Sequence, residues 1–402
     1  MGTETQMTTN GKVWVSQLNE RSAIRTGAAA AEPVRFYDTT LRDGEQTVGV
    51  VLTPQQKFEL ARALDDLGVS RIEAGFPRVS PDDAEAFRLI ARAGLRAEVW
   101  GFARAVRGDI EELAKLGATA TVIEIPCSAI KLQAYGISAA DSLLRVADAV
   151  SLARKNGIRV AFFPVDGTRA NLEHLRAVYL TALEAGAEEV VVVDTIGACT
   201  PEAIEYLVGL VRQWIGPGVP LHFHGHDDFG LATACAVAAV RGGANWIQAT
   251  INGMGERAGN ADIAEVAMAL TCLYGVPVAL RLEKIREVSA RVRAASGYAM
   301  EPWKPVVGET LFLRESGAVA SQFHIPEAIE PFSAELVNAR RAIVLGKKSG
   351  ADSIVIKARE LGLEIPNGKG PEVLAAVKKR GIEKRGLLTD SEFREIVAQY
   401  RC

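Results

Sequence analysis

The chain of 402 residues is long enough for a large domain and a smaller appended one. It is 48% hydrophobic and 24% charged, as ordinary globular proteins are, and its net charge of −3 indicates no basic surface for nucleic acid or anionic lipid. Its five cysteines include no CxxC pair, and their odd number argues against a disulfide framework. We therefore expect a cytoplasmic protein with neither a nucleic-acid nor a membrane partner.

The first 33 residues show no sustained periodicity and lack the continuous apolar core of a signal peptide. A myristoylation signal is also excluded, because Gln6 stands where serine or threonine is required. No stretch of about 20 apolar residues follows that could serve as a membrane span. We interpret residues 1–33 as a flexible N-terminal arm.

From residue 34 onward, short runs of β-branched and aromatic residues alternate with stretches of helical spacing. The expected strands are 34–37, 71–74, 97–101, 121–125, 159–163, 189–193, 220–223 and 245–251. The expected helices between them include 54–67, 81–93, 139–156, 172–185, 201–214 and 232–241. Eight such units predict an α/β fold, a (β/α)₈ TIM barrel over 34–280, rather than a doubly wound open sheet, which needs no eighth unit.

The pattern changes after about residue 280. A helical stretch leads into a Pro/Trp segment at 301–305, then a loop-rich stretch to about 340, and residues 351–402 again have helical spacing with Lys/Arg-rich faces. Basic runs of this kind are usually solvated helix faces. We expect a C-terminal linker and a small, mainly helical subdomain over 281–402.

The pair His224-Gly225-His226 ends an apolar run and suggests a metal site. Residues i and i+2 at a strand end point to the same side, so both imidazoles can reach one ion. An isolated HxH pair is more often structural, but Asp43, after the first expected strand, supplies an oxygen ligand. Because the C-terminal ends of barrel strands meet at one rim, these three residues predict an O/N/N metal site with open positions for substrate.

Other polar residues follow the expected strands at the same rim. Two of them have a plain structural alternative: Asp194 and Thr195 could cap the next helix or close a strand end. Glu73 could likewise be structural and satisfy either Arg42 or backbone donors. The remaining rim residues are Arg104, Ser128, Asp166, Arg169, Asn252 and the glycine-rich loop up to Asn260.

Three segments carry a resemblance to a known family: DTTLRDGEQ at 38–46, HGHDDFGLA at 224–232 and GMGERAGNA at 253–261. They resemble the hallmark motifs of a metal-dependent barrel superfamily that comprises 2-isopropylmalate, homocitrate and citramalate synthases, with hydroxymethylglutaryl-CoA lyase as a more distant relative. The third segment resembles the condensing branch, because the lyases carry a cysteine there. The overall plan is similar to that of short homocitrate synthases.

The resemblance implies an acyltransferase that condenses an acyl-CoA, normally acetyl-CoA, with a 2-oxo acid and releases CoA and a 2-alkylmalate- or homocitrate-type acid. It implies a divalent cation (Mg, Mn or Zn) and a homodimer. The implied metal ligands are Asp43, His224, His226 and Asn260. Arg42 would stabilise the developing alkoxide as a catalytic residue and contact the oxo acid, together with Gln46 and Thr195.

Three segments depart from the family pattern. Residues 314–319 read RESGAV where both family histidines are missing, which leaves Glu315 as the nearest carboxylate for the general base. Residues 163–166 read FPVD and lose a glutamate, and residues 128–131 read SAIK. A cation is a poor base but a good anion clamp, so we expect Lys131, Arg169 and Arg314 to bind substrate.

These departures leave the reaction open between three hypotheses. The first is a condensing enzyme with an unusually anionic acceptor. The second is an aldolase or lyase that acts on a hydroxy acid or its CoA ester at the same metal. The third is a degenerate paralogue that serves as a binding or regulatory subunit.

Overall fold

The computed structural model describes residues 11–21 and 33–400, which form two compact units. The first unit runs from residue 17 to residue 300, and the second combines residues 11–16 with residues 301–400. The division falls at residue 300; the domain limits 34–280 and 281–402, which rest on the change in sequence pattern, stay a prediction. Most of the predicted N-terminal arm lies outside the described residues.

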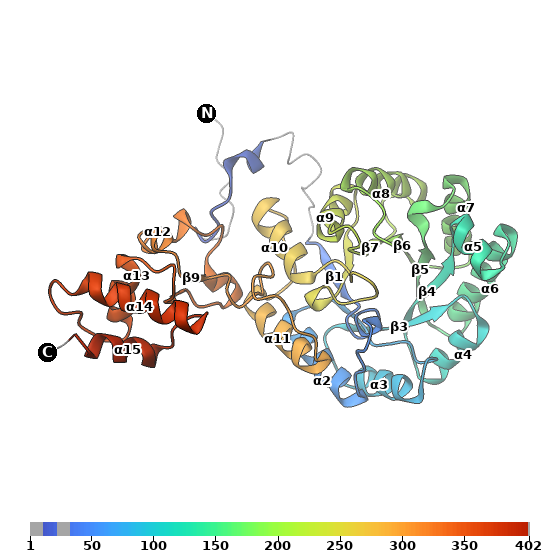
Figure 1. Cartoon of the computed structure of the whole chain (residues 1–402). Helices are drawn as coiled ribbons and strands as arrows, with labels where there is room; N and C mark the ends of the chain where they lie inside the picture. The colour runs from blue at the N-terminus through green and yellow to red at the C-terminus, as the bar shows by residue number, and fades with distance from the viewer. Residues whose placement is uncertain (1–10, 22–32, 401–402) are drawn as a thin grey trace. The chain divides into compact units, whose positions relative to one another are not determined.

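The first unit is a closed barrel of eight parallel strands in sequence order, enclosed by helices (Figure 1). Strand β1 closes the barrel by pairing with β8, with Arg35 opposite Trp246. The strands are β1 (Arg35–Asp38), β2 (Arg71–Glu73), β3 (Glu98–Arg104), β4 (Ala120–Pro126), β5 (Arg159–Val165), β6 (Glu189–Asp194), β7 (Leu221–Gly225) and β8 (Trp246–Ala249). The predicted (β/α)₈ barrel is confirmed.

The helices of this unit begin and end where the local sequence directs. Helix α2 starts with a capping box between Thr53 and Gln56, and it ends at Gly68 with φ 96°, a left-handed conformation that favours glycine. The helices are α2 (Pro54–Leu67), α3 (Pro81–Ala91), α4 (Arg107–Lys115), α5 (Ala129–Tyr135), α6 (Ala139–Lys155), α7 (Leu172–Glu184), α8 (Pro201–Ile215), α9 (Ala232–Arg241), α10 (Ile263–Leu273) and α11 (Ile285–Ser296).

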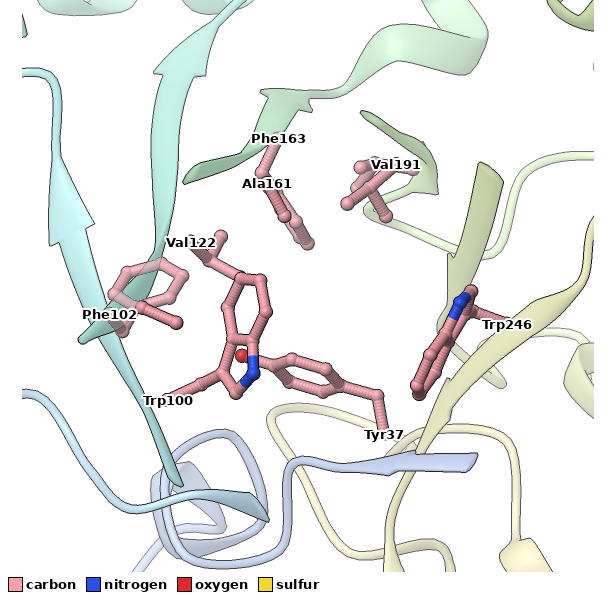
Figure 2. Packing of buried hydrophobic residues seen from close by; sticks show 10 residues of the cluster. Tyr37, Trp100, Phe102, Val122, Ala161, Phe163, Val191 and Trp246 are labelled. Carbon is pink, nitrogen blue, oxygen red and sulfur yellow. The ribbon is translucent and has the colours of Figure 1, made fainter. Parts of the chain in front are cut away.

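Large side chains fill the barrel interior. Figure 2 shows Tyr37, Trp100 and Trp246 pointing into the space that the strands enclose, and the rings of Tyr37 and Trp100 meet edge to face at 5.6 Å. These residues are buried, and each such side chain contributes roughly 1.5–3 kcal/mol by leaving water. The barrel is therefore a packed core, and chemistry is confined to its rim.

A charged network also lies inside the barrel. Arg71 donates two hydrogen bonds to Glu189, at 2.5 and 2.9 Å, and its guanidinium lies 3.7 Å from the ring centre of Trp246. His222 Nε2 lies 2.7 Å from Glu189 Oε2, while Gln248 Nε2 lies 3.4 Å from His222 Nδ1. Burial opposes charge on Glu189, but His222 and Arg71 lower its pKa to about 2. Arg71 and Glu189 can therefore stay charged inside the barrel, because each compensates the charge of the other.

The second unit is mainly helical around a core that includes Val373, Val377 and Phe393. Within it, Val13 pairs antiparallel with Phe332. Its elements are β9 (Leu313–Arg314), α12 (Gly317–Ala320), β10 (Ala342–Ile343), α13 (Ala351–Glu360), α14 (Gly370–Lys384) and α15 (Asp390–Ala398). Among the described residues of both units, no helix is long and apolar enough to cross a bilayer.

Candidate metal centre

Asp43, His224 and His226 converge at the C-terminal rim of the barrel. Asp43 lies in the loop after β1, His224 lies in β7, and His226 directly follows that strand. His224 Nε2 is 3.2 Å from Asp43 Oδ2, and His226 Nε2 is 3.9 Å from the same oxygen. All three side chains are buried, and one ligand atom from each lies within 4.8 Å of the others. The strands thus bring together the three residues that the sequence singled out.

One of the two imidazoles, His226, is held in a ligand-like state. Burial lowers the pKa of His226 to about 4, so this ring is neutral at pH 7. Its Nδ1 lies 3.0 Å from the Gly259 carbonyl and donates to it, so the lone pair on Nε2 faces Asp43. The His224 ring packs edge-on against Phe163, with ring centres 5.1 Å apart.

Two buried oxygen atoms at this site have no hydrogen-bond partner among the described residues: Asp43 Oδ1 and Asn260 Oδ1. Asn260 donates its amide to the Met254 carbonyl at 2.9 Å and pairs with His226 in an isolated bridge. Burial alone raises the pKa of Asp43, but Arg42 and the neighbouring imidazoles hold that pKa well below its usual range. Unpaired buried oxygens beside two imidazoles fit the mixed N/O donor set of a divalent cation.

Arg42 crosses the floor of the site. Its Nε donates to Glu73 Oε2 at 2.6 Å, its Nη1 lies 3.2 Å from Asp43 Oδ2, and its guanidinium lies 4.1 Å from the ring centre of Phe102. Tyr37 donates to the other oxygen of Glu73 at 3.2 Å. Glu73 thus does hold Arg42, as expected; whether it has a further role stays open. Arg42 Nη2 is buried without a partner in the described part of the chain, so it can donate to an anionic ligand atom.

Thr195 and Gln46 lie at the same rim. The Thr195 hydroxyl accepts a hydrogen bond from the Asp166 backbone N–H at 2.7 Å. Helix α8 is capped by Thr200, so the alternative that Asp194 or Thr195 caps it is wrong. Asp194 ends β6 and its carboxylate accepts from the backbone N–H groups that follow. Gln46 is exposed, and its backbone N–H donates to the Asp43 carbonyl at 3.0 Å.

The two predicted anion-binding cations of the barrel differ in their surroundings. Arg169 makes two hydrogen bonds to the buried Asp166, at 2.8 and 2.7 Å, and Ser128 donates to the same carboxylate. Lys131 lies half-buried on α5, and its ammonium has no ion pair within the described residues. Arg169 is therefore a fixed cation at the rim, whereas Lys131 is not fixed by an ion pair.

Arg314 and Glu315 belong to the second unit, where both have partners. Arg314 donates to the carbonyls of Leu311 and Leu313, at 2.7 and 2.9 Å. Glu315 accepts from the Lys348 backbone N–H at 3.0 Å and pairs with the Lys348 ammonium at 3.1 Å. Their substrate-binding and base roles stay predictions.

One residue at the rim escaped the sequence analysis, namely Glu124 on β4. It follows the interior residue Val122 by two positions, so it faces the barrel mouth, where it lines a cavity with Arg104 and Val165. Burial raises the pKa of Glu124 to about 7, against the opposing effects of Arg42 and Arg104. A half-buried carboxyl that titrates near neutral pH is typical of functional sites. The sequence signal that could have identified it is its spacing of two residues from Val122, which places both side chains on the same face of β4.

A parallel (β/α)₈ barrel with two imidazoles and a carboxylate converging at its C-terminal rim defines a barrel enzyme with a site suited to a divalent metal. The family model described as HMGL-like matches residues 33–292. The chain belongs to this family.

Two curated synthases illustrate the relationship. The chain is 44% identical over 379 residues to a homocitrate synthase of Methanopyrus kandleri, with 94% of each chain covered. It is 40% identical over 371 residues to a 2-isopropylmalate synthase of Methanocaldococcus jannaschii, with 90% of this chain and 71% of that one covered. A solved hydroxymethylglutaryl-CoA lyase of Pseudomonas aeruginosa shares the fold, with a TM-score of 0.59, 23% identity, and coverage of 66% of this chain and 94% of its own.

Proposed function

We propose that this enzyme condenses an acyl-CoA, acetyl-CoA in the first instance, with a 2-oxo acid. The donor methyl carbon loses a proton and bonds to the oxo carbon, and water then cleaves the thioester to give a hydroxy acid and CoA. The observation that carries the proposal is the convergence of Asp43, His224 and His226 in a chain about 40% identical to homocitrate and isopropylmalate synthases over most of its length. We extend the proposal to a homodimer in the cytoplasm.

Asp43, His224, His226 and Asn260 would hold a divalent cation, Mg, Mn or Zn. When bound, such an ion supplies Lewis-acid polarisation of the oxo acid carbonyl. The mixed nitrogen and oxygen donors favour Mn or Zn over Mg, whose ligands are mostly oxygens. The neutral His226 ring offers its lone pair without first having to lose a proton.

Arg42 would stabilise negative charge on the reacting oxygen. Its Nη2 has no partner among the residues that the structure describes, while Glu73 and Asp43 fix the rest of the guanidinium. A donor that is fixed before reaction needs no reorganisation when charge develops, and the buried surroundings strengthen its effect. Arg42 is therefore the catalytic residue that we assign most firmly.

The remaining polar groups would bind the acceptor. Thr195 and Gln46 would hold its 1-carboxylate, and Arg169 and Lys131 would favour an acceptor with a second anionic group. Glu124 would line the side-chain pocket, beside Val165. Arg314 would bind substrate and Glu315 would act as the base.

The lyase alternative has less support. The lyase structures share the fold at 19–23% identity, a level that carries no argument about chemistry. The loop at 253–260 contains no cysteine, which the resemblance places in the lyases.

The test is CoA thiol release from acetyl-CoA with Mg, Mn or Zn, across 2-oxoisovalerate, 2-oxoglutarate, pyruvate, oxaloacetate and phosphonopyruvate. Release that depends on one acceptor, with a product whose mass equals acceptor plus acetate, supports the proposal and names the substrate. Metal-loaded protein that releases no thiol with any acceptor, but cleaves a hydroxy acid, would replace the condensation with an aldol cleavage.

A further inference from the structure

One backbone carbonyl connects the glycine-rich loop 253–260 to the candidate metal centre. The Gly259 carbonyl accepts from His226 Nδ1 at 3.0 Å and from the Asp227 backbone N–H at 3.0 Å. The first of these bonds selects the His226 tautomer that directs its Nε2 lone pair toward Asp43. The position of Gly259 therefore controls the orientation of a proposed ligand that lies in a different part of the sequence.

Arg257, two residues before Gly259, fastens this loop to its neighbours. Its Nε and Nη2 donate to the two oxygens of Asp228, at 2.8 and 3.1 Å, and Nη2 also donates to the Thr195 carbonyl at 2.7 Å. One guanidinium thus joins the loop after β8 to the segments after β6 and β7. A two-pronged ion pair of this kind fixes direction as well as distance.

The backbone at Arg257 supports the same interpretation. Its φ of 56° lies in the left-handed region, which residues other than glycine rarely adopt. A residue keeps such a conformation only where the surrounding contacts enforce it, and residues of this kind cluster at functional sites. The loop beneath is tightly packed, because a Cβ on Gly259 would lie 1.9 Å from the Gly253 carbonyl oxygen.

We propose that Arg257 is a positioning residue: its bonds to Asp228 and Thr195 hold the Gly259 carbonyl against His226 and so fix that imidazole for metal binding. The inference rests on the metal centre of the proposed function. Arg257 touches neither a ligand atom nor a substrate group; it acts through the loop. Losing a group that orients a ligand typically costs 10–100-fold in metal affinity, and an indirect group belongs at the lower end.

The test uses the full-length chain, stripped of metal and titrated with Mn²⁺ while the free ion is followed by electron paramagnetic resonance. Arg257→Ala and Asp228→Asn should each weaken Mn²⁺ binding about tenfold. The double variant should be little worse than either single variant, since each single change already breaks the Arg257–Asp228 ion pair. Arg257→Lys, which keeps the charge but loses the two-pronged geometry, should recover only part of the affinity. The matched control is Arg291→Ala, which removes an exposed ion pair with Glu287 on α11 and should leave Mn²⁺ affinity unchanged.

A second readout separates positioning from general destabilisation. In metal-free protein labelled with ¹⁵N-histidine, the His226 ring should be a single Nδ1–H tautomer in wild type and a mixture in Arg257→Ala. Wild-type Mn²⁺ affinity together with a single tautomer in Arg257→Ala would overturn the inference and leave the proposed function intact. Wild-type protein that binds no Mn²⁺ would overturn the metal centre itself, and the inference with it.

Discussion

The Nε2 atoms of His224 and His226 lie 3.3 Å apart, both within 4 Å of one oxygen of Asp43. At that separation the rings cannot both direct a proton at each other. His226 keeps its proton on Nδ1, bonded to Gly259, so a lone pair faces the shared space. A divalent cation bound here would be held by the Asp43 carboxylate and the Nε2 atoms of both imidazoles.

Replacement of His226 by alanine should abolish tight Mn²⁺ binding and the proposed activity while the protein stays folded. The ring lies at the barrel rim, where its nitrogens face Asp43 and the Gly259 carbonyl, so its loss removes a ligand from the site. Calorimetric titration with Mn²⁺ and far-UV circular dichroism check both statements. The control His174→Ala, on α7, should bind as wild type does; equal affinity in both variants would remove His226 from the site.

Arg42→Lys should reduce kcat by about 100-fold and change Mn²⁺ affinity only a few-fold. Lysine cannot donate to Glu73 and to a developing oxyanion in fixed geometry at once. Steady-state rates measured beside a metal titration provide the test. Arg291→Lys, whose guanidinium pairs with Glu287 on the exposed side of α11, is the matched control and should lose little. A kcat loss of similar size in both variants would contradict the assignment.

Glu124 should make stability depend on pH. Its pKa in the fold is about 7, above its ordinary value of 4.5, so the folded protein binds this proton more tightly than the unfolded chain does. Its contribution to stability is complete below about pH 4.5 and is lost as the pH rises through 7, by roughly 3 kcal/mol. Glu124→Gln should therefore be more stable than wild type at pH 8 and similar at pH 4.5. Denaturant unfolding of the metal-free proteins at both pH values measures this difference. Free energies of unfolding that change equally with pH in wild type and Glu124→Gln would refute the prediction.

Breaking the buried network in the barrel should be costly. Glu189→Ala leaves Arg71 charged without its main partner between Trp100 and Trp246, and the expected loss is about 3–5 kcal/mol. The free energy of unfolding in guanidinium chloride measures it. Glu287→Ala, which removes an exposed ion pair on α11, should cost less than about 1 kcal/mol. Equal losses would show that the network is not what holds Arg71.

The barrel could be predicted because the local sequence pattern of each strand and helix indicates that element without knowledge of distant contacts. The apolar run 189–193 becomes β6, which is buried along its whole length, as a strand covered on both faces must be. Thr53 and Gly68 mark the ends of α2. The candidate metal centre could be predicted for a related reason. The C-terminal ends of barrel strands meet at one rim, so once the strands are placed, Asp43 is expected beside His224 and His226.

Other features depend on contacts that no local pattern encodes. The position of Glu124 two residues after Val122 indicates that it faces the barrel mouth, but its proximity to Arg42 and its raised pKa arise only when β3, β4 and β5 are assembled. The bond between Arg257 and Asp228 depends on a left-handed arginine, a conformation that the sequence gives no reason to expect.

The central claim is that a metal held by this triad supports condensation of an acyl-CoA with a 2-oxo acid. The most direct measurement is acceptor-dependent CoA release by chelator-treated protein before and after Mn²⁺ is restored, in wild type and in His224→Ala. The account predicts no release without metal, recovery in wild type and none in His224→Ala, although that variant stays folded. Full release by metal-free protein, or by His224→Ala, would contradict it.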